Sequence, residues 1–220
     1  MGKHLEVINK LHKATKRDYI GRMMDNKVEC MKIAKRYDRD YWDGDRRTGF
    51  GGFKYDGRWV AVAKQLIDQY KLPANARILD VGCGKGFLLY EFTKLLPQCK
   101  VAGFDISKYA IDNAKEEIKK DVFVHKAQDK YPYKDREFDL VISINTIHNL
   151  FLQDVKSAIK EIERVGKNKF VEVEAYRNEQ ELFNLQCWVL TGECFLTPDE
   201  WKFLYQEFGY TGDYEFIYFE

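Results

Sequence analysis

The chain has 220 residues, a length that fits one folding domain. Its formal net charge is +1 and 45% of its residues are hydrophobic, so the composition gives no sign of a disordered, nucleic-acid-binding or membrane-spanning protein. The five cysteines include no C-x-x-C pair, which argues against a disulfide or zinc framework and fits a reducing cytoplasm.

Charge is distributed unevenly along the chain. Residues 1–36 carry ten Lys and Arg against four Asp and Glu, whereas residues 193–220 carry seven acids against one Lys. The commoner arrangement is two solvated faces that can pair with each other, and the alternative is a basic N-terminal surface facing an anionic substrate. Apolar residues at helical spacing in residues 5–36 predict one or two amphipathic helices.

Residues 37–57 form an unusual stretch with five glycines and six aromatic residues. Glycine allows hinge motion, and aromatic rings can exclude water from a bound ligand. We therefore interpret residues 41–55 as a lid, with Tyr41, Trp42 and Phe53 as candidates to contact the substrate. An irregular loop that packs its rings into the core is the alternative.

The remaining residues, 58–220, alternate apolar strands with helices. The alternation predicts an α/β fold with a mostly parallel sheet and helices on both faces. Together with residues 1–57, an N-terminal helical extension and lid, these elements are expected to form a single domain. The predicted strands are 77–81, 100–105, 122–126, 139–144, 169–174 and 214–219, and the predicted helices are 58–71, 85–96, 107–119, 153–165 and 197–208.

Residues 78–87, Ile-Leu-Asp-Val-Gly-Cys-Gly-Lys-Gly-Phe, join the first predicted strand to its helix. Glycine at every second position indicates a tight turn whose backbone approaches a ligand, because glycine has no side chain and adopts positive φ. The spacing fits neither the G-x-G-x-x-G dinucleotide motif nor the G-x-x-x-x-G-K-S/T phosphate loop. A turn that only closes a strand–helix unit is the alternative.

Asp105 ends the second predicted strand, 21 residues after Gly84. A carboxylate at the tip of the neighbouring strand can accept hydrogen bonds from both ribose hydroxyls of a nucleoside. Together with the glycine turn, Asp105 therefore predicts a nucleoside ligand without a pyrophosphate.

Residues 78–87, 103–107 and 138–150 resemble the cofactor motifs of class I S-adenosylmethionine-dependent methyltransferases. The resemblance implies a Rossmann-like fold and S-adenosyl-L-methionine as cofactor. In that family the glycine turn approaches the methionine moiety and ribose, the acid after the second strand holds the ribose, and residues after the third strand flank adenine. The implied cofactor-binding residues are Asp80, Gly82, Cys83, Gly84, Gly86, Asp105, Ile106, Ala127, Gln128 and Asn145.

The C-terminal region is predicted to contain a helix and one strand. Thr197 and Glu200 fit a capping box, which marks the start of the helix. The family usually closes its sheet with two strands after this helix, as an antiparallel hairpin, but only residues 214–219 fit here. Either the edge of the sheet is shortened, or residues 193–196 supply the other strand.

Ligands of open parallel sheets bind beyond the carboxyl ends of the strands. This rule nominates His148, after the fourth strand, as a general base, since imidazole titrates near neutral pH. A loop histidine that bonds the backbone is the alternative. After the fifth strand, Tyr176, Arg177 and Asn178 are candidates to bind polar groups of the substrate, although Arg177 could instead pair with Glu174 or Glu179 on the surface. No residue cluster predicts a metal site.

The resemblance and these residues lead to a cytoplasmic methyltransferase that acts on a small polar metabolite, with oxygen as the expected acceptor atom. The N/D-P-P-Y/F motif of amine-methylating relatives is absent, because residues 145–148 read Asn-Thr-Ile-His at that place. Its absence disfavours the DNA methylases that act on exocyclic amines and the glutamine methylases. One alternative is a methyltransferase that acts on a protein or RNA and uses the basic N-terminus for docking. Another is a non-catalytic, cofactor-binding partner subunit. Neither a membrane nor a nucleic acid is an expected partner.

Overall fold

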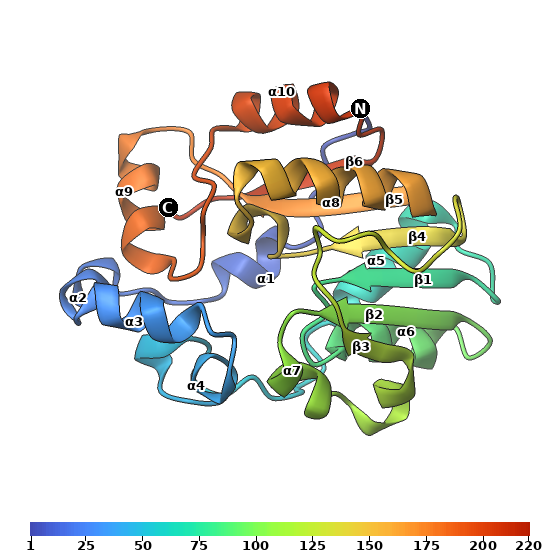
Figure 1. The fold of residues 1–220 in the computed structure, drawn as a ribbon, viewed down its shortest axis with the longest axis horizontal. Coiled ribbons are helices and arrows are strands. Elements are labelled where there is room, and N and C mark those ends of the chain that lie inside the picture. The colour runs from blue at the N-terminus through green and yellow to red at the C-terminus, as the bar shows by residue number, and fades with distance from the viewer.

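The computed structural model describes all 220 residues and contains a six-stranded sheet in the order β3-β2-β1-β4-β5-β6 (Figure 1). Every strand is parallel to its neighbours. The strands are β1 (Arg77–Val81), β2 (Lys100–Asp105), β3 (Val122–Val124), β4 (Phe138–Ser143), β5 (Gly166–Glu174) and β6 (Asp213–Ile217). The predicted parallel sheet is confirmed, with β3 shorter than expected.

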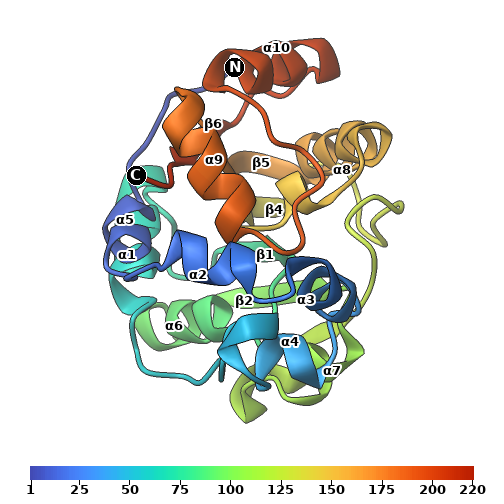
Figure 2. The same cartoon turned by 90° about the vertical axis from the view of Figure 1, so that its left-hand side faces the viewer.

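Helices cover both faces of the sheet, as the alternation of strands and helices predicts (Figure 2). On one face, α5 (Val60–Tyr70) and α6 (Phe87–Leu95) bury Leu66 and Phe92 against Ile78 of the central strand. On the other face, α8 (Leu152–Val165) and α10 (Pro198–Phe208) bury Ile159 and Trp201. Because both faces of β1 are covered, all of its residues except Arg77 are buried, including Asp80.

The connection between β2 and β3 differs from the single helix predicted for residues 107–119. It consists of α7 (Lys108–Asp112) and a 3₁₀ turn, η2 (Glu116–Asp121). Between them, the backbone N–H of Lys115 donates to the carbonyl of Lys85 in the glycine turn, at 3.1 Å. This tertiary hydrogen bond takes Lys115 out of the helical ladder. A further helix, α9 (Glu179–Trp188), was not predicted.

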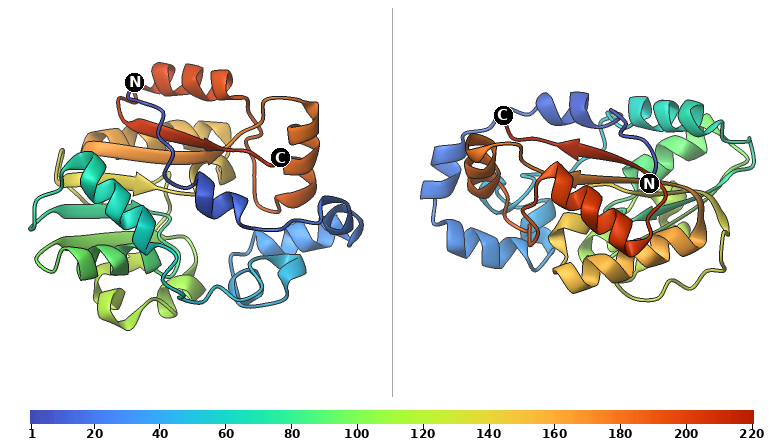
Figure 3. Two further views of the ribbon diagram at one scale, coloured as in Figure 1. Left: turned by 180° about the vertical axis from the view of Figure 1, so that it is seen from behind. Right: turned by 90° about the horizontal axis from the view of Figure 1, so that it is seen from above.

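The C-terminal edge of the sheet is shortened, because β6 is its last strand and residues 193–196 form none. The N-terminal chain lies along β6 instead (Figure 3). Leu5 N–H donates to the carbonyl of Tyr214 at 2.9 Å, and the side chain of Glu215 accepts from three successive N–H groups, those of Val7, Ile8 and Asn9. The N-terminal region is therefore hydrogen-bonded to β6. Ion pairs of Lys13 with Glu220 and of Lys35 with Glu193 also join the basic N-terminal and acidic C-terminal regions.

Four short helices precede the sheet and lie beyond the carboxyl ends of its strands (Figures 1 and 2). They are α1 (Asn9–Lys13), α2 (Tyr19–Met24), α3 (Lys27–Ala34) and α4 (Arg39–Trp42). Residues 5–36 thus form three helices rather than one or two, because Asp18 caps a new helix and Asn26 adopts a left-handed φ of 44°. No helix of the chain has both the length and the apolar character needed to cross a membrane.

Candidate functional site

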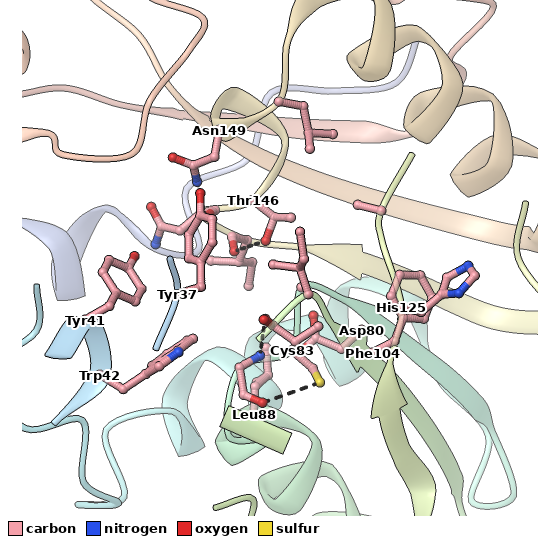
Figure 4. Close-up of a pocket in the computed structure, with 18 of the residues that line it drawn as sticks. Tyr37, Tyr41, Trp42, Asp80, Cys83, Leu88, Phe104, His125, Thr146 and Asn149 are labelled. Atoms are coloured by element: carbon pink, nitrogen blue, oxygen red, sulfur yellow. Dashed lines mark hydrogen bonds between the residues drawn. The ribbon is translucent and has the colours of Figure 1, made fainter. Parts of the chain in front are cut away.

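Two adjoining cavities lie between the N-terminal helices and the carboxyl ends of the strands. The first, of about 330 Å³, contains the glycine turn and is called the glycine-turn cavity (Figure 4). The second, of about 400 Å³, is called the arginine cavity because Arg17, Arg22 and Arg46 line it. The residues that line both cavities are Tyr41, Phe50, Phe53, Trp59, Asn145 and Asn149.

The glycine-turn cavity brings together most of the residues nominated from the sequence. Those that line it are Asp80, Gly82, Cys83, Gly84, Asp105, Ile106, Ala127, Gln128, Asn145, Tyr41, Trp42 and Phe53. Gly86 does not, because it starts α6, and a Cβ atom there would meet the side chain of Ile118 in the core. Gly86 therefore shapes the turn and does not face the cavity.

Gly84 is the glycine that the cavity requires most directly. Its φ is +55°, a left-handed value that residues with a side chain rarely adopt. A Cβ atom at Gly84 would come within 2.8 Å of the Trp42 ring, so the indole lies directly over the turn. The Gly84 N–H donates to Asp105 Oδ2 at 2.9 Å, which joins the ends of β1 and β2.

Two buried carboxyl groups meet in the glycine-turn cavity. Asp80 is 5% exposed, and burial together with the nearby charge of Asp105 raises the pKa of Asp80 to about 8. Burial also raises the pKa of Asp105, whose Oδ1 accepts a hydrogen bond from the Ser107 N–H at 2.8 Å. Asp154 also lines this cavity, and no Lys or Arg does. A cationic ligand would lower the pKa of Asp80 and stabilise its charged form, so the cavity suits such a ligand.

Two further polar atoms at the glycine-turn cavity lack partners. His125 Nε2 and Asn149 Oδ1 are buried without a hydrogen bond, although their side chains line the cavity (Figure 4). Buried polar atoms are nearly always paired in folded proteins, so a ligand would satisfy them. Neither residue was nominated from the sequence. His125 follows the observed β3, but the strand predicted over 122–126 placed it inside the strand, where the strand-end rule does not select it.

The segment predicted to be a lid packs over the glycine turn. The Trp42 indole N–H donates to Ser107 Oγ at 2.9 Å, and the Ser107 hydroxyl donates to the carbonyl of Tyr37. Phe53 stacks on Phe87 at the start of α6, with ring centroids 5.0 Å apart and planes at 14°. The rings of Tyr41, Trp42, Phe50 and Phe53 thus form one wall of the cavity.

A buried ion pair fastens this segment to the glycine turn. Lys85 Nζ lies 2.6 Å from Asp43 Oδ2 and also donates to the carbonyl of Phe53 at 3.0 Å. The Tyr109 hydroxyl donates to the same Asp43 oxygen at 2.9 Å. Burial alone would raise the pKa of Asp43, but the hydrogen bonds from Lys85 and Tyr109 outweigh it and lower that pKa. Lys85 and Asp43 therefore hold residues 43–53 against the glycine turn.

We expect Asp43→Asn to loosen the lid without unfolding the chain, because it removes the charge that pairs with the buried Lys85. Backbone amides of residues 50–55 should exchange with deuterium about tenfold faster or more, as a loss of about 1.5–3 kcal/mol of local stability requires. Hydrogen exchange with mass spectrometry measures this. The control is Asp56→Asn, since Asp56 pairs with exposed Arg58. Equal exchange in both variants would show that the pair does not hold the lid.

His148 lines the arginine cavity rather than the glycine-turn cavity. Its side chain is buried, Nδ1 accepts a hydrogen bond from the Glu174 N–H at 3.1 Å, and Nε2 lies 3.3 Å from Glu174 Oε2. Burial lowers the pKa of His148 to about 3. Since its accepting nitrogen is already engaged by the backbone, this geometry argues against the role of general base expected from the sequence and agrees with the structural alternative.

The residues nominated after β5 lie outside both cavities, which argues against the expectation that they bind substrate. Arg177 pairs with Glu181 and, at 2.9 Å, with Glu220. Asn178 caps α9 by accepting a hydrogen bond from the Glu181 N–H. Tyr176 packs against the apolar cluster around Phe219. Each was nominated for its residue type, and each has a structural partner.

Glu174 is the acidic residue that lines the arginine cavity. It ends β5 beside His148, and burial raises the pKa of Glu174 to about 8 against the opposing effect of Arg17 and Lys27. Sequence reasoning missed Glu174 as a site residue, although it follows from the strand-end rule. The three arginines gave no such signal, because they come from the N-terminal helices and the lid segment.

Comparison with known proteins identifies the family. Residues 72–209 match a family model described as a methyltransferase domain. The chain belongs to the class I S-adenosylmethionine-dependent methyltransferases. The match begins before β1 and ends just after α10. It therefore includes strands β1 to β5, the glycine turn and Asp105, and β6 follows it.

Curated relatives of this methyltransferase share part of its length. It is 31% identical to a demethylmenaquinone methyltransferase of Chlorobaculum tepidum over 51% of this chain and 46% of the relative. It is 29% identical to human mitochondrial arginine-hydroxylase NDUFAF5 over 61% of this chain and 39% of the relative. A malonyl-[acyl-carrier protein] O-methyltransferase of Legionella pneumophila is 35% identical over 36% of this chain and 29% of the relative. The chain thus spans less than half the length of these relatives.

Solved structures support the fold alone. YcgJ from Bacillus subtilis has a TM-score of 0.53 at 20% identity, with 66% of each chain covered. A Haloferax volcanii methyltransferase, solved in complex with the activator Trm112, has a TM-score of 0.54 at 17% identity, covering 71% of this chain and 77% of the other. Both agree with the Rossmann-like sheet described above.

Proposed function

We propose that this methyltransferase binds S-adenosylmethionine in the glycine-turn cavity and methylates an oxygen atom of a small polar metabolite in the arginine cavity. The observation that carries the proposal is the pair of adjoining cavities, one with acidic and the other with mostly basic ionisable side chains. Asp80, Asp105 and Asp154 line the first without Lys or Arg, whereas five Lys and Arg and one Glu line the second. The residues shared by the two cavities would border the point of methyl transfer.

The glycine-turn cavity suits the cofactor chemically. S-adenosylmethionine carries a sulfonium and an ammonium group, for which Asp80 and the aromatic wall of Tyr41 and Trp42 are favourable surroundings. Asp105 can accept hydrogen bonds from ribose hydroxyls, and Ala127 and Gln128 can flank the base. When bound, the cofactor supplies an electrophilic methyl group. The chain's own part is to hold the two reactants in line and to exclude water.

Glu174 is the best-placed proton acceptor for a hydroxyl substrate. Its carboxyl group lines the arginine cavity, and a pKa near 8 makes it a stronger base than an ordinary glutamate. His148 keeps this carboxyl in place, since its ring contacts Oε2 while its other nitrogen accepts from the Glu174 N–H. We assign His148 as a positioning residue and Glu174 as the base.

A small acceptor is favoured by the size of the arginine cavity, about 400 Å³. Its wall includes Arg17, Arg22 of α2, Trp188 of α9 and Phe219 after β6. Oxygen is favoured because the Legionella relative is named an O-methyltransferase. The human relative is named an arginine hydroxylase, so methyl transfer itself must be measured. Turnover of a metabolite library with methyl-labelled S-adenosylmethionine makes that measurement.

We expect Asp105→Ala to weaken S-adenosylhomocysteine binding at least about tenfold, because each hydrogen bond to a charged acceptor contributes about 1.5–3 kcal/mol. Titration calorimetry measures the affinity, and circular dichroism checks the fold. The matched control is Asp112→Ala, since Asp112 pairs with exposed Lys108 at the end of α7. Unchanged affinity in Asp105→Ala would remove the ribose assignment. No binding by the parent protein would remove the cofactor assignment altogether.

A further inference from the structure

Three arginine side chains converge on one tryptophan in the arginine cavity. The guanidinium carbons of Arg22, Arg46 and Arg17 lie 4.7, 5.1 and 5.6 Å from the centre of the Trp188 ring. They come from three separate parts of the chain: α2, the η1 turn (Arg46–Thr48) and the α1–α2 connection. Contact with an aromatic face stabilises a cation, but three like charges around one ring also repel each other.

None of these three arginines forms an ion pair. Arg22 donates to the carbonyls of Trp188 and Arg46, and Arg46 donates to the carbonyl of Gly49. Arg17 donates to the carbonyls of Thr15 and His12 and lies 3.1 Å from His12 Nδ1, and its buried Nε has no partner. Because a guanidinium has five N–H donors, each of the three keeps donors free. Most other arginines of the chain, by contrast, have a carboxylate partner.

Capping of α9 does not account for the cluster. The carbonyls at the C-terminal end of α9 accept hydrogen bonds from Arg22 and from buried Lys27, which reaches both Cys187 and Val189. Cations at a helix C-terminus are favourable, so Arg22 has a partial structural reason. Neither Arg17 nor Arg46 hydrogen-bonds to α9. Their approach to Trp188 therefore concentrates positive charge beyond what the helix requires.

The surroundings leave this charge uncompensated. Glu174 is the acid of the cavity, and its raised pKa of about 8 means that it is largely protonated at neutral pH. Burial, and then the charge of Arg46, lower the pKa of Arg22 to about 10, so its charged form is destabilised without a partner. The basic N-terminal region therefore has a double role: Lys13 and Lys35 pair with C-terminal acids, while Arg17 and Arg22 face the cavity.

We propose that Arg17, Arg22 and Arg46 bind the methyl acceptor through a compact anionic group, a carboxylate or a phosphate. The inference rests on the proposed function, because it names the substrate class of the same site. Guanidinium groups match both anions in shape and hydrogen-bond geometry. An anion held against Trp188 would leave the rest of the acceptor toward Asn145 and Asn149, the polar residues that the two cavities share.

The test is calorimetric titration of the parent protein with inorganic phosphate and, separately, with succinate, at constant ionic strength. We expect saturable binding of at least one probe. Arg22→Gln and Arg46→Gln should each weaken it about tenfold or more, as loss of a charged hydrogen-bond donor implies. The matched control is Arg47→Gln, because Arg47 is adjacent to Arg46 but pairs with Asp25 at 2.8 Å. The probe that binds with the higher affinity shows whether the site prefers phosphate or carboxylate.

Three results would overturn the inference: binding of neither probe, unchanged binding in both glutamine variants, or equal weakening in Arg47→Gln. S-adenosylhomocysteine is titrated into the same variants. Retained cofactor binding with lost anion binding shows that the variants are folded and that the anion site is separate. Anion binding without cofactor binding in the parent protein would reject the proposed function and leave the anion site standing. If Arg22→Gln unfolds, Arg46→Gln tests the anion site alone, because Arg46 is exposed and its substitution should not disturb folding.

Discussion

We expect Gly84→Val to weaken S-adenosylhomocysteine binding about a hundredfold or more while leaving the sheet folded. Two effects act together. The φ of +55° at Gly84 is strained for any residue with a side chain, and most strongly for a β-branched one. In addition, a Cβ atom would come within 2.8 Å of the Trp42 ring, so the valine side chain must displace the indole or enter the cavity. Titration calorimetry measures the loss of affinity.

A matched control separates backbone strain from filling of the cavity. Gly57 also has a positive φ, +77°, but a Cβ atom there would have no neighbour within 4 Å. Gly57→Val therefore carries a comparable strain without entering the ligand site, and its cofactor affinity should equal that of the parent. Circular dichroism and thermal melts of both variants report on folding. If Gly84→Val binds S-adenosylhomocysteine as tightly as Gly57→Val does, the glycine turn does not contact the ligand.

The glycine turn and Asp105 could be predicted because their signals are local. A glycine at every second position after an apolar strand constrains the backbone wherever it occurs, and Asp105 ends the next strand. The two meet because β1 and β2 are parallel neighbours whose carboxyl ends lie at the same edge. Short-range sequence patterns thus define the glycine-turn cavity, including the aromatic residues of the lid.

The arginine cavity could not be predicted in this way. Arg22 and Trp188 are separated by 166 residues, and their proximity depends on how α2 packs against α9. The sequence gives α9 only a weak apolar periodicity, and its start signal, Asn178, was interpreted as a substrate ligand. Since a side chain's partners decide its role, residue type alone also misjudged His148 and Arg177. Both are satisfied by neighbours that only the tertiary structure supplies.

Glu174→Gln tests the assignment of the base, and we expect it to lower kcat by about 10²–10⁴-fold toward a hydroxyl acceptor. A general base must be ionised to act. Because burial raises the pKa of Glu174 to about 8, the parent's rate should rise with pH and level off above that value. The glutamine variant should lose this dependence while its affinity for S-adenosylhomocysteine stays the same, as Glu174 lies outside the glycine-turn cavity.

Stability provides the internal control for the same substitution. The pKa of Glu174 is raised from 4.5 to about 8 in the folded protein, so the folded protein binds this proton more tightly than the unfolded chain does. The free energy of unfolding therefore falls as the pH rises through this interval, and Glu174→Gln should reduce that fall, leaving the part that Asp80 contributes through its own raised pKa. A lower rate at pH 8 with equal or higher stability cannot come from unfolding. His148→Gln should shift the acid limb of the rate profile without abolishing it, because His148 positions the carboxyl group. If His148→Gln abolishes the limb and Glu174→Gln keeps it, the base is His148.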